Sequence, residues 1–511
     1  MIDKELTLRA DGSFRISRGG FDSGSVLSVW PGKSLTLGGS GTLTLDGCNR
    51  GGAVVESNGA LTMLDGARIT GGNSGGVFTY GAFTMHGGSI SGNSGEYGGG
   101  VNISYNGTFT MTGGSISGNT ASCGGGVFIN NFTGCAFEMT GGTISGNSAS
   151  EFGGGGVHNR GTFTMSGGTI SGNDAPVGGG VDVDNDGTFA MSGGTISDND
   201  ATGGGGVVVV NGATFLMSGG KISDNDATDG GGVFNLGQFT MEDGTISGND
   251  ATRWGGGVCN DGAFAMEGGS IAGNSAGQFG GGVWNNGTFA MSGGSTADNA
   301  SNMEGAGVYA GSEGEITMSG EAAIGDELFL KETSIIAVGE GFAGSARVTP
   351  EKYEVGVRVL AELEEGEVYD EPTRLAFAIK PREDLLWQVD EDGLLTLATD
   401  VARVRWGAGA DDFEDFALFA DAVDKANEMG TATITLLNDV VLTDTAEIES
   451  GKTITLTSSG PHGIARGPVH EGVMLSVYGT LHLVGGGGLT VDGRGVVGTN
   501  YNYIAIVRSG G

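Results

Sequence analysis

Aspartates at fixed positions of a repeat are the residues of this chain whose type and spacing best suit chemistry. An aspartate follows the same asparagine in four successive copies, and in two copies another aspartate precedes it. If the copies stack as parallel strands, these carboxylates lie about 4.8 Å apart and repel one another. Calcium binds carboxylate oxygens and would relieve the repulsion, whereas the alternative is a solvated turn with counterions. The candidate calcium ligands are Asp174, Asp198, Asp200, Asp224, Asp226 and Asp250.

Aromatic residues form a second set of candidates. A valine follows each run of glycines, and the residue after that valine points outward if the valine points inward. Aromatic residues hold this place in several copies, and others stand just before a glycine run. Aromatic side chains exposed in a row can stack on sugars or pack against a protein, whereas the alternative is that loops cover the sheet here. The candidate ligand-binding residues are Phe128, Phe234, Trp254 and Trp284.

Both sets belong to a repeat that runs over residues 51–318. Its methionines mark the period, which varies from 22 residues, between Met63 and Met85, to 28 residues, between Met111 and Met139. A short and regular period indicates one supersecondary unit stacked on itself. The copies are rich in Gly and Asn, which disfavour helix, so the unit is expected to consist of strands.

One copy contains three short segments that alternate apolar and polar residues, as strands do: 163–165, 169–171 and 181–183. Gly-Gly and Asn-Gly pairs between them supply the positive φ angles that turns need. Three strands and three turns per copy predict an all-β fold, a right-handed parallel β-helix with coils of about 25 residues. Columns of Val, Phe, Met and Ile are expected to fill its interior.

An asparagine recurs in every copy and forms a further column. Stacked side-chain amides hydrogen-bond from coil to coil and satisfy the backbone of turns, so we interpret this column as structural. Its expected members are Asn73, Asn93, Asn119, Asn147, Asn173, Asn199, Asn225, Asn249, Asn274 and Asn299.

Composition excludes some partners. The chain of 511 residues has 107 glycines, 7 prolines and a formal net charge of −36. Residues 51–318 contain four basic residues, so nucleic acid is not an expected partner, and anionic lipid should repel the rod. None of the four cysteines forms a CxxC pair, so no zinc site is expected. Cys123 and Cys135 could form a disulfide or fill small apolar positions.

A stretch of the chain is duplicated. The segment that begins with Leu6-Thr-Leu8 returns in a second copy that begins with Ile454-Thr-Leu456, at an offset of 448 residues for most of its length. Residues 411–430, before the second copy, read as an amphipathic helix with an acidic first turn and a final glycine. An open β-helix end needs a cover, so we expect this helix to cap the second module. We interpret the chain as part of a longer protein, with any signal peptide or anchor outside it.

These observations divide the chain into five parts. The first, 1–50, holds the lead-in coils of a β-helix, and the second, 51–321, its glycine-rich repeats. The third, 322–400, is a β-rich cap or connector. The last two, 401–430 and 431–511, are the capping helix and the start of a second, truncated β-helix.

The stretch Ile170-Ser-Gly-Asn173-Asp-Ala175, followed by Gly178-Gly-Gly180-Val181, resembles the repeat of polymorphic outer-membrane proteins and related bacterial β-helix surface proteins. The likeness covers roughly half of the chain through its column residues. The family's Phe-x-x-Asn reads Ile-Ser-Gly-Asn in most copies here. Those families are secreted or surface-exposed adhesins, so the resemblance implies an extracellular or cell-surface location in bacteria and an adhesive role.

An enzyme is the alternative, since pectin-degrading enzymes also use this predicted fold. Their chemistry needs clustered carboxylates with calcium and a basic residue, or paired carboxylates that flank a sugar bond. Arg160 has only Glu151 and Asp174 as acidic neighbours in sequence, and His86 and His158 are isolated.

We therefore expect no enzymatic activity. The expected function is that of an adhesin or stalk that contacts a host or microbial surface glycan or protein and inserts no part of this chain into a membrane. The alternative is a polysaccharide-binding or polysaccharide-cleaving, pectate-lyase-like β-helix.

Overall fold

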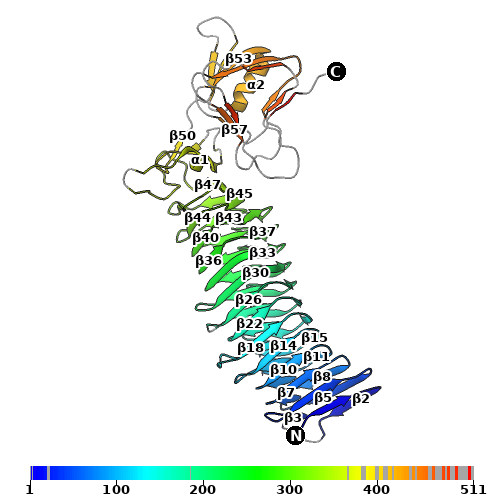
Figure 1. The fold of residues 1–511 in the computed structure, drawn as a ribbon. Coiled ribbons are helices and arrows are strands. Elements are labelled where there is room, and N and C mark those ends of the chain that lie inside the picture. The colour runs from blue at the N-terminus through cyan, green and yellow to red at the C-terminus, as the bar shows by residue number, and fades with distance from the viewer. Residues whose placement is uncertain are drawn as a thin grey trace. The chain divides into compact units, whose positions relative to one another are not determined.

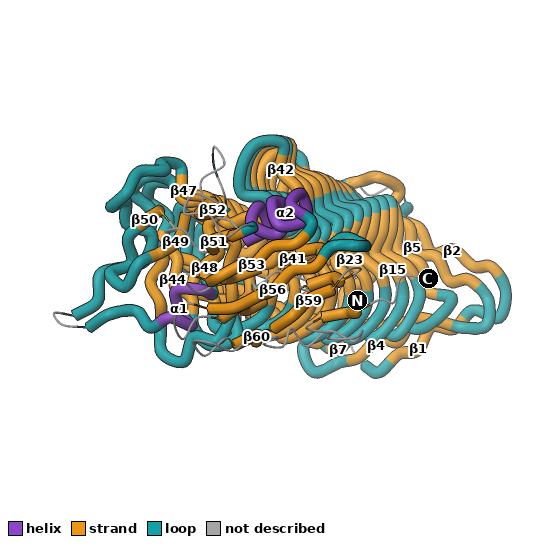
Figure 2. Tube along the Cα trace, turned by 90° about the horizontal axis from the view of Figure 1, so that it is seen from above, coloured by secondary structure: helices purple, strands orange, loops and turns teal. Residues whose placement is uncertain are grey.

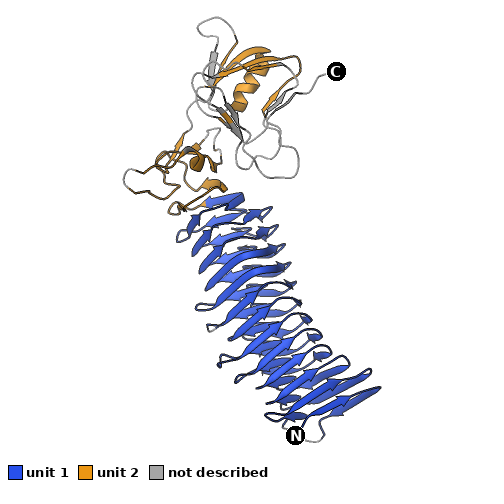
Figure 3. Cartoon of the chain, in the orientation of Figure 1, with its two compact units in different colours: residues 1–329 blue, residues 330–511 orange. Residues whose placement is uncertain are grey.

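The computed structural model describes residues 2, 4–19, 24–184, 186–364, 367–380, 382, 387–397, 402–406, 413–416, 419–436, 440–442, 446–458, 463–466, 475–477, 480–483, 490–492 and 505–507. It is 54% strand and 4% helix and forms a parallel β-solenoid of about 16 turns, as the sequence predicted. The chain divides into two compact units, residues 1–329 (unit 1) and residues 330–511 (unit 2), which are coloured separately in Figure 3.

Unit 1 is built from coils whose strands pair in parallel with the same strands of the next coil (Figures 1 and 2). In one middle coil, β25 (Val181–Val183), β26 (Thr188–Met191) and β27 (Thr195–Ser197) are the three predicted strands. A fourth strand, β28 (Asp200–Gly203), was not predicted; it pairs with its counterparts in a separate sheet. Partners keep their register, so that Val181 lies opposite Val207.

Each strand type recurs along unit 1. The strands that follow the glycine runs are β3 (Leu27–Val29), β6 (Val55–Ser57), β9 (Val77–Thr79), β13 (Val101–Ile103), β17 (Val127–Ile129), β21 (Val157–Asn159), β25, β29 (Val207–Val209), β32 (Val233–Asn235), β35 (Val258–Asn260), β39 (Val283–Asn285) and β43 (Val308–Ala310). The strands of the phenylalanine and methionine columns are β1 (Leu6–Arg9), β4 (Ser34–Gly38), β7 (Ala60–Met63), β10 (Ala82–Met85), β14 (Thr108–Met111), β18 (Ala136–Met139), β22 (Thr162–Met165), β26, β36 (Ala263–Met266), β40 (Thr288–Met291) and β44 (Glu315–Met318). The strands of the isoleucine column are β2 (Ser13–Ser17), β5 (Thr42–Arg50), β8 (Ala67–Gly72), β11 (Ser89–Ser91), β15 (Ser115–Ser117), β19 (Thr143–Ser145), β23 (Thr169–Ser171), β27, β37 (Ser270–Ala272), β41 (Ser295–Ala297) and β45 (Ala323–Leu330). Two strands, β30 (Thr214–Ser223) and β33 (Gln238–Ser247), run through both of these positions. The fourth strands are β12 (Ser94–Tyr97), β16 (Thr120–Cys123), β20 (Ser148–Ala149), β24 (Asp174–Val177), β28, β31 (Asp226–Asp229), β34 (Asp250–Trp254), β38 (Ser275–Ala276) and β42 (Ala300–Ser301).

The predicted apolar columns fill the interior of unit 1. Phe163, Met165, Ile170 and Val181 are all buried, as are their column mates. Successive phenylalanine rings from Phe83 on stack nearly parallel, with centroids 4.5 to 4.9 Å apart. Each buried ring contributes roughly 1.5–3 kcal/mol by removal from water, and stacked pairs add about 0.5–1.5 kcal/mol. Identical residues in register therefore hold each coil to its neighbours.

The asparagine column forms a buried hydrogen-bond ladder. The side-chain amide of Asn199 donates to Asn225 Oδ1 at 2.9 Å and to the carbonyl of Ile170 at 3.1 Å. Its Oδ1 accepts from the backbone N–H and from the side-chain amide of Asn173, at 3.0 and 2.9 Å. Each asparagine in the ladder thus ties together three coils, as stacked amides were expected to do.

The ends of this ladder differ from the prediction. Asn73 is exposed and lies outside it; instead the N–H of Gly72 donates to Asn93 Oδ1 at 2.9 Å. At the other end, the side-chain amide and N–H of Asn299 donate to Asp326 Oδ2 at 2.9 and 3.1 Å. Each side-chain amide of the ladder donates to an oxygen atom of the following coil. The coil after Asn299 therefore needs only an acceptor at this position, and the carboxylate of Asp326 supplies it.

A second, shorter asparagine ladder was not predicted. It lies at the ends of β32, β35 and β39, where Asn235 donates to Asn260 Oδ1 and Asn260 donates to Asn285 Oδ1, each at 2.7 Å. All three asparagines are buried. Their side chains also donate to backbone carbonyls, so this part of the solenoid is held by two polar ladders rather than one.

Unit 2 combines short strands with two helices in its described part. Its elements are β46 (Ile336–Val338), β47 (Ser345–Pro350), α1 (Glu371–Leu375), β48 (Phe377–Ile379), β49 (Trp387–Val389), β50 (Leu395–Leu397), β51 (Ala402–Arg405), β52 (Phe413–Phe416), α2 (Phe419–Met429), β53 (Thr431–Leu436), β54 (Val440–Leu442), β55 (Ala446–Ile448), β56 (Thr453–Ser458), β57 (Gly463–Arg466), β58 (Leu475–Val477), β59 (Thr480–Leu483), β60 (Thr490–Asp492) and β61 (Ala505–Val507). Strands β53 to β61 form coils of a second solenoid, with parallel pairs such as β53–β56 and β56–β59.

The capping helix is shorter than predicted. Residues 413–416 form β52, which pairs antiparallel with β51, so pairing with a neighbouring strand overrides the helical pattern there. Helix α2 begins at Phe419 and buries Phe419, Val423 and Ala426 in a core that includes Ile434 and Leu456. The predicted apolar face therefore covers the start of the second solenoid.

Candidate functional site

The second sheet covers much of the surface for which the sequence left two alternatives, an exposed row of aromatic side chains or shielding by loops. In the described part of the chain, nine fourth strands, from β12 to β42, pair in parallel. Aromatic residues near the ends of these strands pack on the residue after the column valine of the next coil. Ring centroids lie 5.1 Å apart for Tyr97 and Phe128, and 4.6 Å apart for Phe279 and Tyr309. In these coils the aromatic residues are therefore covered, which is the alternative to an exposed row of aromatic side chains.

The four candidate ligand-binding aromatics have different surroundings. Phe128 is 2% exposed, so the expectation that it faces solvent is wrong; the rings of Tyr97 and His158 pack against it. Phe234 is half-buried and lies two coils before Trp284 in the same column, with Cys259 between them. Trp254 and Trp284 are also half-buried and stack on each other, with centroids 5.1 Å apart and ring planes 10° apart. The structure thus brings these two together, without the other two.

Polar side chains hold the tryptophan pair. The guanidinium carbon of Arg253 lies 4.2 Å from the ring centroid of Trp254, and Arg253 Nε donates to Asp229 Oδ1 at 3.0 Å. The indole N–H of Trp254 donates to Gln278 Oε1 at 3.1 Å. An aromatic anchor with arginine and a polar rim has the composition of binding hot spots. This tryptophan pair is the candidate binding surface that best matches the sequence prediction.

A cluster of ionisable side chains, which we call the charged rung, joins His158 and Arg160 of one coil to Asp182 and Asp184 of the next. His158 Nδ1 lies 2.9 Å from Asp182 Oδ2, and its Nε2 lies 3.6 Å from Asp184 Oδ2. Arg160 Nε donates to Asp184 Oδ2 at 3.0 Å. The interpretation of His158 as isolated and of Arg160 as without these partners is therefore wrong.

The parallel register explains why sequence reasoning missed the charged rung. β21 pairs with β25 so that His158 lies opposite Asp182, 24 residues later. A search for acidic neighbours close in sequence could not find this pair. A comparison of the residues after each column valine could have found it, because the column runs from Phe128 through His158 to Asp182.

The inner half of the charged rung is buried. The side chains of His158 and Asp182 are 2% and 5% exposed, and the Phe128 ring stacks on the imidazole with centroids 5.2 Å apart. Despite the ion-pair contact, no described residue forms a well-directed hydrogen bond with either ring nitrogen of His158 or with Asp182 Oδ1. The backbone of Gly153 closes over Asp182, where an added Cβ would lie 1.9 Å from Oδ2. A large ligand has no open path to this pair.

The predicted column of aspartates exists as a ladder in the second sheet. Asp174 pairs with Asp200, Asp200 with Asp226, and Asp226 with Asp250. Burial raises the pKa of the Asp226 carboxyl, and the neighbouring charges of Asp250 and Asp200 raise it further. The stacking of the coils therefore brings these four carboxylates close enough to repel one another. No group of three or more His, Cys, Asp or Glu side chains among the described residues is placed to hold a metal ion, so calcium stays a prediction.

The other two candidate calcium ligands occupy turns. Asp198 and Asp224 have φ angles of +56° and +58°, at the place where another copy has Gly172 with φ +62°. Aspartate tolerates this left-handed conformation better than most side chains. The turn therefore gives both residues a structural role, and Asp224 also lies 4.0 Å from the Lys221 ammonium.

The buried cysteines are not reactive sites. Cys123 and Cys135 are free and buried, so the disulfide alternative is not realised. Burial raises the pKa of the Cys123 thiol to about 12, although nearby Arg160 opposes the shift. Since the thiolate is the nucleophile, this residue is inert at neutral pH.

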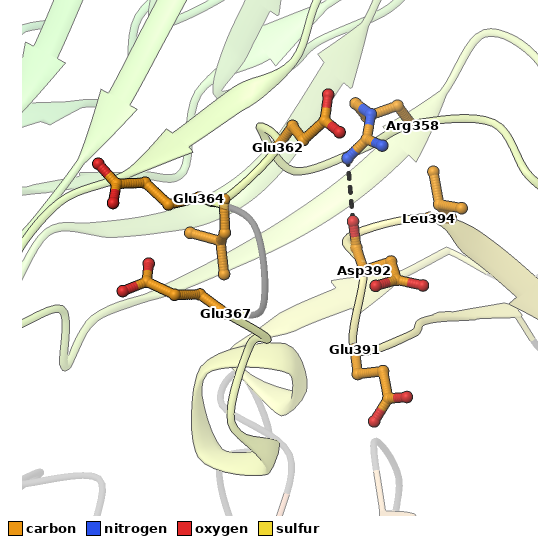
Figure 4. A pocket seen from close by; sticks show the side chains of 8 residues that line it. Arg358, Glu362, Glu364, Glu367, Glu391, Asp392 and Leu394 are labelled. Atoms are coloured by element: carbon orange, nitrogen blue, oxygen red, sulfur yellow. Dashed lines mark hydrogen bonds between the residues drawn. The ribbon is translucent and has the colours of Figure 1, made fainter.

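Unit 2 contains an acidic pocket that the sequence analysis did not identify (Figure 4). Its volume is about 320 Å³. Arg358 donates to the backbone carbonyl of Asp392 at 2.9 Å. The residues that line the pocket are Arg358, Glu362, Leu363, Glu364, Glu367, Glu391, Asp392 and Leu394. The surplus of carboxylates favours cations over anions.

Helices α1 and α2, the helices of the described residues, lack the length and apolar character that a membrane span requires. Comparison with protein families, curated proteins and solved structures gives no match to this chain. The fold and the arrangement of its side chains are therefore the basis for any proposal about function.

Proposed function

We propose that this chain is a non-catalytic bacterial β-solenoid protein, secreted or at the cell surface, that acts as an adhesin or a stalk. In this role it would be similar to the polymorphic outer-membrane protein adhesins that its repeat resembles. The observation that carries the proposal is the half-buried, stacked pair of Trp254 and Trp284 with its polar rim, on a rod whose interior columns repeat from coil to coil.

The copies keep the interior residues and differ where the second sheet meets the first. Columns of Val, Phe, Met, Ile and Asn repeat with few exceptions and are buried. The residue after the column valine is instead Phe128, His158, Asp182, Val208 or Trp284 in different coils. The first four of these residues are buried beneath the second sheet, and of the five Trp284 alone is partly exposed, so the variation reaches the surface at Trp284.

The tryptophan pair is the half-buried aromatic surface of unit 1 that best suits a surface glycan or protein. Trp254 and Trp284 offer aromatic area, and Arg253, Asp229 and Gln278 provide hydrogen-bonding groups around it. Aromatic and arginine anchors dominate binding free energy at protein interfaces. The repeat as a whole, with four basic residues between residues 51 and 318, suits neither nucleic acid nor anionic lipid.

Binding of the full chain to glycan and protein arrays tests the proposal. The chain should retain a restricted set of surface glycans or proteins, and the variant with Trp254→Ala and Trp284→Ala should lose them by tenfold or more. Phe152→Ala is the matched control, because it removes an aromatic ring that is 54% exposed elsewhere on the same unit. Equal loss in both variants would contradict a site at the tryptophan pair.

A polysaccharide-cleaving β-solenoid is the second candidate, and the charged rung is the observation that favours it. Asp184 and Arg160 are its partly exposed members, at 22% and 28%. A carboxylate beside a basic group is one element that such chemistry requires. Release of unsaturated or reducing sugar ends from acidic polysaccharides, abolished by Asp184→Asn, would support this candidate over the first.

A further inference from the structure

Three aromatic rings, which we call the ring stack, lie along successive turns of unit 1. Tyr80 follows β9, Tyr105 follows β13 and Phe132 follows β17, so the rings occupy the corresponding turn of three consecutive coils. The ring centroids of Tyr80 and Tyr105 lie 5.8 Å apart, and those of Tyr105 and Phe132 lie 4.1 Å apart with ring planes 16° apart. Tyr105 is 58% exposed and Phe132 40%. An exposed group of apolar rings is typical of an interaction surface.

The backbone at the middle ring of the stack is strained. Tyr105 has a φ of +48°, and Asn106, the next residue, has a φ of +67°. A bulky side chain rarely adopts this left-handed conformation, and residues held in it gather at binding and catalytic sites. The ring of Tyr105 is mostly exposed, so its burial does not compensate for the strain. The strained turn therefore points to a function for the ring stack.

The ring stack ends at a step in the solenoid. The turn after β17 has six residues, 130–135, whereas the corresponding turn after β21 has two, 160–161. The two turns still pair at their ends, since the N–H of Arg160 donates to the Ile129 carbonyl at 2.9 Å and a second such bond of 3.2 Å closes their far ends. Residues 131–134 therefore have no counterpart in the next coil, and all four are exposed.

The step leaves one face of Phe132 without a stacked ring from the next coil. Tyr105 stacks on the other face, and the next coil offers Arg160 and Gly161 at this place. The coil after that contributes Asp184, which accepts from Arg160 Nε at 3.0 Å. The side chains of Arg160 and Asp184 are 28% and 22% exposed. Two coil spacings separate Phe132 from the coil of Asp184, roughly 10 Å, which leaves room for one ring between them.

The groups around this space suit a neutral sugar. The apolar face of a pyranose ring stacks on an aromatic face, and its hydroxyls bond to an amide such as that of Asn131 or to the exposed edge of the Arg160–Asp184 pair. Residues 130–135 carry no charge, Arg160 is already paired, and the net charge of −36 opposes an anion. A space for one ring is far smaller than the interface of about 1,200–2,000 Å² that a stable protein partner needs.

We propose that the space between Phe132 and Asp184, which we call the sugar notch, binds one residue of a neutral glycan. The pyranose ring stacks on the open face of Phe132 and continues the ring stack by one position. The sugar notch lies several coils before the tryptophan pair in unit 1 and extends the proposed adhesin function by a second contact. Two sites on one rod strengthen the binding of a long glycan when both are engaged.

Saturation-transfer NMR of the full chain with small probes tests the proposal. The neutral probes are maltotriose, mannotriose and N-acetylchitotriose, and the contrasting probes are the acidic sugar trigalacturonate and the aromatic compound N-acetyltryptophanamide. At least one neutral probe should bind, and Phe132→Ala should weaken its affinity tenfold or more. Deletion of residues 131–134 shortens the turn to the two residues found in the next coil, keeps every column residue and should have the same effect. Trp30→Ala is the matched control, because Trp30 is 51% exposed in the corresponding turn of an earlier coil, outside the ring stack.

The outcomes separate the sugar notch from the tryptophan pair. Affinity for the neutral probe should stay within twofold in Trp30→Ala and in the double variant Trp254→Ala and Trp284→Ala. Loss of binding in the tryptophan double variant alone would support the proposed function and overturn the sugar notch. Binding of no neutral probe, or of the acidic or aromatic probe alone, would also overturn it.

Discussion

Removal of one amide from the middle of the asparagine ladder should destabilise the neighbouring coils by about 4 kcal/mol. Asn199→Ala deletes four hydrogen bonds, two donated to Asn225 and Ile170 and two accepted from Asn173. Each is worth roughly 0.5–1.5 kcal/mol net, and all lie in the buried interior, where water cannot replace them easily. The sum is therefore on the order of 2–6 kcal/mol.

The same sequence position supplies a matched control. Asn73 belongs to the repeated pattern, yet it is exposed and accepts one hydrogen bond, from Ser94 Oγ at 3.2 Å. Asn73→Ala should therefore change stability by no more than about 0.5 kcal/mol. A contrast between two members of one sequence column separates the ladder from the intrinsic properties of asparagine.

Urea unfolding and hydrogen exchange provide the assay. The exchange rate of the Asn173 N–H, which loses its acceptor in Asn199→Ala, should rise by about a thousandfold if the local cost is near 4 kcal/mol. Exchange in distant coils should change less, since each coil contacts only its neighbours. Equal unfolding free energies for Asn199→Ala and Asn73→Ala, together with unchanged exchange at Asn173, would refute the ladder as a source of stability.

Three further predictions concern titratable side chains. The pKa of the Asp226 carboxyl is raised in the folded state. Its contribution to stability is therefore complete below the unfolded pKa of about 4 and is lost as pH rises through the folded pKa. Asp226→Asn should stabilise the chain near pH 7, and the rise in melting temperature on mild acidification should be smaller in this variant than in the unchanged chain. His158→Ala leaves Asp182 buried without its partner and should cost about 3–5 kcal/mol in urea unfolding. The double variant His158→Phe and Asp182→Val, which uses side chains found in the same column, should recover most of that loss, and no recovery would contradict the role of the pair. Cys123, whose thiol pKa is about 12, should resist alkylation by iodoacetamide at pH 7.5 until the chain unfolds. Cys48, which is half-exposed, should be alkylated earlier. Equal alkylation rates of the two cysteines in the folded chain would contradict the burial of Cys123.

The sequence predicted the interior columns of unit 1, which repeat in nearly every coil. The period placed Phe163, Met165, Ile170 and Val181 in the interior, because identical residues in register must stack. It also predicted the acid ladder. These predictions succeed because a local pattern, repeated at one spacing, leaves few alternatives for packing.

Features that interrupt the period could not be predicted in the same way. The charged rung depends on two adjacent coils that differ from the rest, and Asp326 ends the asparagine ladder from outside the repeat. The fourth strand recurs and alternates between exposed and buried positions, but its buried positions hold small residues such as Ala201 and Gly203, which give a weak apolar signal in the sequence. Asn73 fits the pattern but precedes the first coil in which the ladder forms, so the pattern alone placed it wrongly.

The central claim, that this solenoid binds a surface partner without chemical turnover, is tested most directly by measuring binding and cleavage in the same samples. The purified full chain is incubated with a panel of acidic and neutral polysaccharides and with surface glycoproteins, and retained ligand and newly formed sugar ends are quantified together. We predict selective retention that depends on Trp254 and Trp284, with no increase in sugar ends over hours. Release of sugar ends that is abolished by Asp184→Asn would contradict the claim.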